Sequence, residues 1–196
     1  MMLASARVFT AILLLVLAST VCAQNITRGP YLQLVTDDSV IVRWRTDIAT
    51  DSYVRYGSSA GSLIQTASVG GSRTEHSVLV SGLNPVTQYF YSIGDSSQTT
   101  AGDASYHFNT APTPGSASPT RIWVIGDSGT ANSNARAVRD AFKIWSASQA
   151  ADFMLMLGDN AYNDGTDAEY QSAVFDTYPE LLRQLPLWST LGNHDG

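Results

Sequence analysis

The stretch 122–129, IWVIGDSG, is a continuous apolar run that ends in a small polar cluster. Such a run is typical of a strand buried on both faces of a parallel sheet. The same arrangement returns at 153–162, FMLMLGDNAY, and at 187–195, LWSTLGNHD. Because helical patterns separate the three runs, the order strand, helix, strand, helix, strand predicts an α/β layer with right-handed crossovers.

The two expected helices of this layer carry different signals. Asn134 can cap the first helix, and apolar residues at positions i, i+3, i+4 and i+7 predict one buried stripe along it. This stripe consists of Val138, Ala141, Phe142 and Trp145. Thr166 and Glu169 form a capping-box pattern, which predicts a second helix that runs to about Tyr178.

The polar clusters follow the carboxyl ends of the three expected strands. Parallel strands bring these ends to one edge of the sheet, where the sites of open α/β sheets lie. We therefore expect Asp127, Asp159 and Asn193 to converge. Two carboxylates brought close repel each other unless a proton or a cation lies between them, and carboxylate, amide and phenol oxygens suit hard metals. Any one cluster could be an ordinary turn, but the three together predict a metal site suited to phosphate-ester hydrolysis.

Residues 29–110 have a different pattern, in which short runs of alternating residues are separated by Gly, Ser, Asn and Asp. Val40, Val42 and Trp44, for example, share one face of such a run. Period-two patterning with this spacing predicts a β-sandwich. The run 83–89, LNPVTQY, resembles the corner of a fibronectin type III domain, where a tyrosine hydroxyl bonds to nearby backbone. Trp44 would then be a core residue.

Two segments flank the sandwich. Residues 112–120, PTPGSASPT, are rich in Pro and Ser without periodicity, which predicts a linker. Residues 1–23 combine a positively charged start, the apolar run VFTAILLLVL and small residues before Gln24. Because that run is short for a bilayer span, a cleaved secretory signal peptide is favoured over a membrane anchor. We expect a secreted, extracellular protein with no membrane attachment after cleavage.

The composition narrows the class of function. The 196 residues are 44% hydrophobic and carry a formal net charge of −6. They contain no run of Lys and Arg, so nucleic acid is not an expected partner. An acidic protein does not attract phosphate esters by its overall field, so local cations would have to bind them. Cys22, the only cysteine, falls within the expected signal peptide, so neither disulfides nor thiolate metal ligands are expected in the mature chain. The sequon at Asn25 predicts glycosylation if the source is eukaryotic.

The three polar clusters have the forms GD-x-G, GD-x-x-Y and GNHD, and they resemble the first three metal motifs of calcineurin-like metallophosphoesterases. Tyr162, three residues after Asp159, resembles the iron-binding tyrosine of the purple acid phosphatases in that superfamily. The resemblance implies a two-domain chain. An all-β fibronectin III-like sandwich at 25–111 would be followed, after the linker, by the N-terminal part of an α/β metallophosphoesterase domain (α/β/β/α sandwich) at 121–196.

The resemblance also implies a role for each matching position. Asp127 would bind the first metal, a ferric ion, and Asp159 would bridge both metals. Tyr162 would be a phenolate ligand of the iron, and Asn193 would bind the second metal, a divalent Fe, Zn or Mn. His194 would lie beside the metals, where it orients phosphate or protonates the leaving group.

The implied activity is that of a secreted acid phosphatase, which hydrolyses phosphomonoesters with a hydroxide that bridges the two metals. A phosphodiesterase or nucleotidase of the same superfamily is one alternative. An inactive secreted sandwich module with a truncated catalytic domain is another. Asp195 stands where many relatives have Glu, which leaves the fourth position of its motif open. The oligomeric state is also left open.

The family carries two further motifs, V-x-x-H and GH-x-H, which supply histidine ligands. Apart from His194, the sequence has His76 and His107, both in the sandwich, where strand-surface positions are expected. The stretch that ends at Gly196 therefore holds only part of the implied ligand set. We expect this stretch to be inactive by itself.

Overall fold

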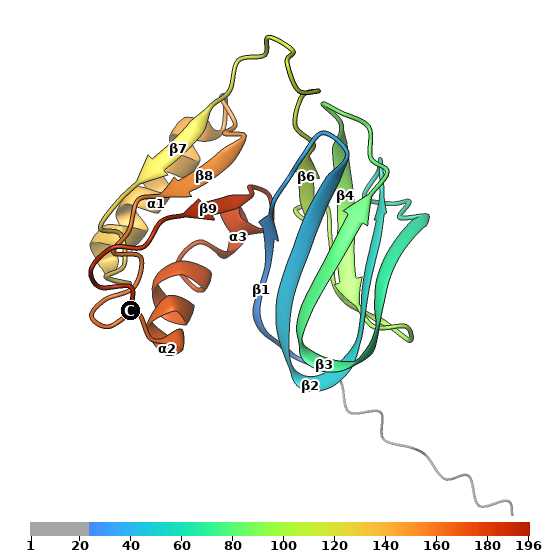
Figure 1. Ribbon diagram of the computed structural model, residues 1–196, viewed down its shortest axis with the longest axis horizontal. Helices are drawn as coiled ribbons and strands as arrows, with labels where there is room; N and C mark the ends of the chain where they lie inside the picture. The colour runs from blue at the N-terminus through green and yellow to red at the C-terminus, as the bar shows by residue number, and fades with distance from the viewer. Residues whose placement is uncertain (1–23) are drawn as a thin grey trace, which may run out of the picture.

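The computed structural model describes residues 24–196, which form a β-sandwich and a parallel α/β layer (Figure 1). The expected signal peptide, residues 1–23, lies outside the described residues. The expected linker, 112–120, contains neither helix nor strand and leads from the sandwich into the layer. Within the described range, no helix is long and apolar enough to cross a membrane.

The sandwich is antiparallel, and its long second strand takes part in both of its layers. The first half of β2 pairs with β1 and with the end of β3, and the second half pairs with β4 and with the start of β3. The short strands β5 and β6 pair with β4. The bounds are β1 Ile26–Gln33, β2 Ser39–Gly57, β3 Gln65–Ser81, β4 Gln88–Gly94, β5 Thr99–Ala101 and β6 His107–Asn109.

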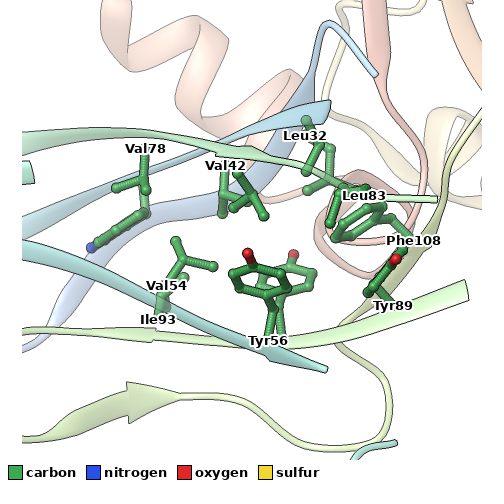
Figure 2. Packing of buried hydrophobic residues seen from close by; sticks show 13 residues of the cluster. Leu32, Val42, Val54, Tyr56, Val78, Leu83, Tyr89, Ile93 and Phe108 are labelled. Atoms are coloured by element: carbon green, nitrogen blue, oxygen red, sulfur yellow. The ribbon is translucent and has the colours of Figure 1, made fainter. Parts of the chain in front are cut away.

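The sandwich core lies between these two layers. Val40, Val42 and Trp44 of β2 are at most 1% exposed. Figure 2 shows Val42 on one side of the core and Val54, from the second half of the same strand, on the other. Burying an aliphatic side chain of this size contributes about 1.5–3 kcal/mol. The alternating pattern in the sequence therefore predicted the buried face of β2 and the burial of Trp44.

The expected tyrosine corner is present at the start of β4. The hydroxyl of Tyr89 accepts a hydrogen bond from the backbone N–H of Asn84 at 3.0 Å. Tyr89 is 7% exposed, and its ring packs against Phe108 with 5.9 Å between the ring centroids. Figure 2 shows Tyr89 beside Phe108 at one end of the core. This prediction is confirmed.

His76 lies in the core of the sandwich, so the expected surface position is wrong for this histidine. Its side chain is 1% exposed and stacks on Trp44, with 4.6 Å between the ring centroids. Its two ring nitrogens each lie 2.8 Å from a hydroxyl, one of Thr46 and one of Ser52. These two partners satisfy the imidazole without water. His107 is half-buried on β6.

The α/β layer has the predicted order of elements. Strands β7 (Ile122–Ile125), β8 (Phe153–Met156) and β9 (Leu187–Ser189) are parallel neighbours in that order. Helix α1 (Ser133–Ser146) connects β7 to β8 and packs on the sheet. The predicted fold class, a sandwich followed by a parallel α/β layer, is confirmed.

The prediction that β7 is buried on both faces is wrong. Trp123 and Ile125 pack on the helices, whereas Ile122 and Val124 on the other face are 46% and 48% exposed. Trp188 of β9, also on that face, is 45% exposed. Two right-handed crossovers that advance in the same direction put both helical connections on one face of a sheet. No helix among residues 24–196 packs on the opposite face, where Phe153, Leu155 and Trp188 line a cavity shared with sandwich and linker residues.

Helix α1 differs from its prediction in its cap and in its buried face. Asn132, not Asn134, is the cap, and its side-chain oxygen accepts hydrogen bonds from the N–H groups of Asn134 and Ala135. Phe142 is buried and stacks on Trp123 at 3.9 Å between ring centroids. The first and last residues of the expected stripe, Val138 and Trp145, are 55% and 57% exposed. The prediction of one continuous buried stripe is therefore wrong.

The second helical segment is shorter and less regular than predicted. Its capping box is present, since Thr166 and Glu169 bond to each other's backbone N–H. Helix α2 (Asp167–Tyr170) then passes into a π-helical turn, η1 (Gln171–Phe175), and α3 (Pro179–Leu182) follows. The expected continuous helix to Tyr178 is therefore wrong. The wider π turn places Gln171 and Phe175 against the sandwich, as described below.

Candidate metal centre

The three polar clusters lie together at the carboxyl edge of the β7–β8–β9 sheet, close to the C-terminus of the described chain (Figure 1). Backbone hydrogen bonds join the first two clusters. The N–H of Asp127 donates to Gly158 O at 3.1 Å, and the N–H of Gly129 donates to Asp159 O at 3.0 Å. The N–H of Tyr162 in turn donates to Gly129 O at 3.0 Å. The loops therefore hold each other in place before any ligand is considered.

Gly192 allows the third cluster to approach the second. A Cβ atom at this position would lie 2.2 Å from Asp159 Oδ1, which is too close for any side chain. The bare backbone instead lets the N–H of His194 donate to the same Oδ1 at 3.1 Å. A glycine is therefore required at this position of the loop.

Asp127 and Asp159 both have left-handed backbone conformations, with φ of 51° and 50°. Non-glycine residues are uncommon in this region, and holding one there costs on the order of 1–3 kcal/mol. Each follows a glycine at the end of its strand. The same strained turn at two neighbouring strand ends brings both carboxylates to the same place, which favours a functional reason for the strain.

The hydroxyl of Tyr162 lies between these two carboxylates. It is 3.0 Å from Asp159 Oδ2 and 3.2 Å from Asp127 Oδ1. Burial and the two carboxylates raise the pKa of Tyr162 to about 12. Without a cation, the phenol therefore stays protonated across the whole physiological range.

The arrangement fits a hard cation. A phenol has one proton, so it can donate to only one of the two carboxylates. The oxygen of the second carboxylate then faces the phenol oxygen with no proton between them. A metal ion bound by all three oxygens would remove this conflict and would favour the phenolate. Within residues 24–196, no group of three or more His, Cys, Asp or Glu side chains lies close enough to hold a metal. The candidate site therefore depends on the phenol of Tyr162 as well as on carboxylates.

His194 lies next to this oxygen cluster. Its ring centroid is 4.8 Å from that of Tyr162, and its Nδ1 lies 2.8 Å from the carbonyl oxygen of Asn163. Since a carbonyl can only accept, Nδ1 carries the proton, and the other nitrogen, Nε2, is left free for a ligand. Asn193, the fourth predicted ligand, is exposed between Gly192 and His194 on the same loop.

Asp195 organises the site, a role that its motif did not predict. Its side chain is 8% exposed and accepts hydrogen bonds from Gly192 N, Asn160 N, Ala161 N and Tyr170 OH at 2.8, 2.8, 3.2 and 3.0 Å. Burial opposes the ionised form, but these donors hold the pKa of Asp195 below its ordinary value. The only signal in the sequence was its position directly after His194.

Asn25, the predicted glycosylation site, lies away from the metal centre at the start of the sandwich. It is exposed, and its side-chain amide donates to Asp47 at 2.7 Å. The amide nitrogen is the atom to which a glycan would be attached. Its exposure leaves room for that modification.

Comparisons with known proteins give matches for both parts of the chain. Residues 28–110 match the family model of the purple acid phosphatase N-terminal domain, and residues 120–196 match that of the calcineurin-like phosphoesterases. Purple acid phosphatase 15 of Arabidopsis thaliana is 30% identical over 123 residues, which cover 60% of this chain and 22% of that relative.

The fold is also similar to that of a solved structure of PhoD. The TM-score is 0.64, with 15% identity, over 86% of this chain and 39% of the PhoD chain. The described chain thus spans well under half the length of either relative. The two matched segments lie in the order sandwich and then α/β layer, and they make the chain similar to metallophosphoesterases of the purple acid phosphatase kind.

Proposed function

We propose that this protein is a secreted metal-dependent hydrolase of phosphomonoesters, of the acid phosphatase type. The observation that carries the proposal is the meeting of Asp127, Asp159 and Tyr162 oxygens at the carboxyl edge of a parallel sheet. The similarity of residues 120–196 to the calcineurin-like phosphoesterases supports a metal-dependent phosphoesterase. The signal-peptide pattern at 1–23 and the absence of a basic run in the sequence support secretion and a partner other than nucleic acid.

The ligand set favours Fe(III) at the position next to Tyr162 and a second, divalent Fe, Zn or Mn ion nearer Asn193. With a pKa of about 12, the phenol gives up its proton at acidic pH only to a strongly charged cation. Asp159 contacts both other loops, through Gly129 N and His194 N, and its carboxylate would be the ligand shared by the two ions. When bound, two such ions would activate a water molecule and stabilise the charge that develops on the ester.

The protein groups around the ions have separate tasks. The N–H of His194 holds Asp159 Oδ1, which leaves Oδ2 turned towards Tyr162. The Nδ1–H of His194 donates to Asn163 O, so Nε2 is the atom that can bind a phosphate oxygen or deliver a proton to the leaving group. Asp195 holds the backbone of the two loops together by accepting from Asn160 N and Gly192 N.

The test compares two ligand substitutions in the protein expressed from its complete coding sequence. Asp159→Ala should abolish hydrolysis of 4-nitrophenyl phosphate, because it removes a ligand shared by both ions. Asn193→Ala should leave measurable activity, because it removes one ligand of one ion. Metal content per chain, measured by mass spectrometry, should fall further in Asp159→Ala. Equal, small losses in both variants would contradict the proposed assignment.

A further inference from the structure

The loop that follows Tyr162 is held by a single carboxylate. Glu169 of α2 accepts hydrogen bonds from the N–H groups of Asn163, Asp164 and Thr166 at 2.6, 3.3 and 2.9 Å. The hydroxyl of Thr166 donates to the same carboxylate at 2.8 Å. Hydrogen bonds from Thr166 and then from the other N–H groups lower the pKa of Glu169. We refer to these contacts as the Glu169 clamp.

The Glu169 clamp is connected to the candidate metal centre through Asn163. Its N–H is bound by Glu169, and its carbonyl oxygen is the acceptor for His194 Nδ1 at 2.8 Å. That oxygen decides which imidazole nitrogen carries the proton and how the ring is turned. A change in the position of Glu169 would therefore be passed to the His194 ring over one residue.

The helix that carries Glu169 is bound from the sandwich by Arg28 of β1. This arginine is 7% exposed, and its guanidinium lies 3.0 Å from Asp167 Oδ1. It also donates to Asp167 O at 3.1 Å and to Gln171 Oε1 at 2.6 Å, and it lies 4.3 Å from the ring centroid of Phe175. A buried charge of this kind is stable only when such partners are in place.

Arg45 of β2 binds the same aspartate from a second direction. Its Nη1 donates to Asp167 Oδ1 and Oδ2 at 2.9 and 2.7 Å, and its Nε pairs with Glu75 of β3. Hydrogen bonding by Arg45 lowers the pKa of Asp167. Asp167 is therefore ionised and shared by two arginines of the sandwich. Figure 1 shows α2 beside the lower end of the sandwich, next to β1.

We propose that the sandwich domain is a positioning element for His194. Arg28 and Arg45 fix Asp167 at the start of α2, Glu169 on the same helix fixes Asn163, and the carbonyl of Asn163 orients the imidazole. The inference rests on the proposed function only in treating His194 as a catalytic group. The contacts themselves require neither metal nor substrate.

The first test measures hydrogen exchange of the loop in the metal-free protein. Arg28→Ala should raise the exchange rates of the Asn163, Asp164 and Thr166 amides by about tenfold, as expected when charged hydrogen bonds are released. Arg55→Ala is the matched control, because the contacts of Arg55, with the carbonyl of Asp95 at 2.8 Å and with the ring of Tyr53, lie within the sandwich. It should leave these rates unchanged.

The second test reads the orientation of the ring by nitrogen NMR of the His194 imidazole, recorded for all variants at one mildly alkaline pH. Arg28→Ala and Glu169→Ala should both reduce the fraction with the proton on Nδ1. Arg28→Lys keeps the charge and Glu169→Gln keeps one acceptor oxygen, so each should restore part of the signal. A purely structural role would lower stability without moving the imidazole signals.

Asp167→Asn covers the case in which Arg28→Ala does not fold, since Asp167 has a side chain that is 65% exposed. Faster hydrogen exchange of the loop amides and altered imidazole signals in this variant would support the proposal. Wild-type exchange and wild-type imidazole signals in a folded Arg28 or Asp167 variant would overturn it. Neither readout depends on turnover or on metal. A failed phosphatase assay would therefore contradict the proposed function without contradicting the positioning role of the sandwich.

Discussion

The carboxylate of Asp195 binds Asn160 twice, accepting from its backbone N–H at 2.8 Å and from its side-chain amide at 3.0 Å. Asn160 is 1% exposed, and its amide also donates to Thr190 O at 2.8 Å. The pair joins the loop after β8 to the loop after β9, which are the loops that carry Asp159 and His194. The geometry of the candidate metal centre therefore depends on a residue that is not expected to touch the metals.

Asp195→Asn should destabilise the α/β layer by about 1–3 kcal/mol. The substitution replaces one accepting oxygen with a donor, which would face an N–H group of Gly192 or Asn160. Urea denaturation followed by tryptophan fluorescence measures the loss. Asp140→Asn, at an exposed position on α1, is the control and should change stability by less than about 0.5 kcal/mol. Equal stability of the two variants would contradict this role of Asp195.

His76 should make the sandwich less stable at acidic pH. Burial, followed by the charge of Arg73, lowers the pKa of His76. The proton on Thr46 goes to Ile48 O at 2.8 Å, so His76 Nε2 donates to Thr46 and Nδ1 accepts from Ser52. Protonating Nδ1 would break this pattern inside the core.

The pH range in which His76 stabilises the sandwich follows from the direction of its pKa shift. The unfolded chain has the higher histidine pKa, near 6.5, so the contribution of neutral His76 is complete above pH 6.5 and is lost as the pH falls through the folded pKa. Unfolding free energies at pH 7.5 and pH 5 should therefore differ more in the wild type than in His76→Gln. The same pH dependence in both proteins would rule out this contribution.

Tyr162→Phe should remove the visible absorption of the protein loaded with Fe(III), because that band would arise from charge transfer between phenolate and iron. Tyr170→Phe is a matched control. Its hydroxyl donates to Asp195 at 3.0 Å, whereas that of Tyr162 lies against Asp127 and Asp159. Absorption spectra recorded at equal iron content decide the matter. A colourless wild type with bound iron would exclude the phenolate ligand and leave the broader metallophosphoesterase assignment.

The uncovered face of the sheet should make residues 24–196 bind hydrophobic dyes and self-associate. Ile122, Val124 and Trp188 form an exposed apolar patch on this face. Val124→Lys should lower both the fluorescence of a bound dye and light scattering. Ile144→Lys on α1, where the native side chain is 79% exposed and stands on the opposite side of the layer, should have a smaller effect. We also expect this stretch alone to show no phosphatase activity.

The sequence determined the features that depend on neighbouring residues. Period-two alternation marked the buried face of β2, and the run 83–89 predicted the tyrosine corner, because these signals lie within a few residues of chain. The capping box formed by Thr166 and Glu169 was likewise predictable from the sequence. The convergence of Asp127 with Asp159 was also predictable, because parallel strands place their carboxyl ends on one edge.

Only the tertiary structure decided which contacts form between distant segments. The buried stripe of α1 could not be placed from its periodicity, since Val138 and Trp145 are both more than half exposed. His76 is buried because hydroxyl groups more than twenty residues away reach both of its nitrogens. Arg28 meets Gln171 across 143 residues of sequence. Such contacts depend on how the sandwich packs on the α/β layer, and a local pattern carries no information about that packing.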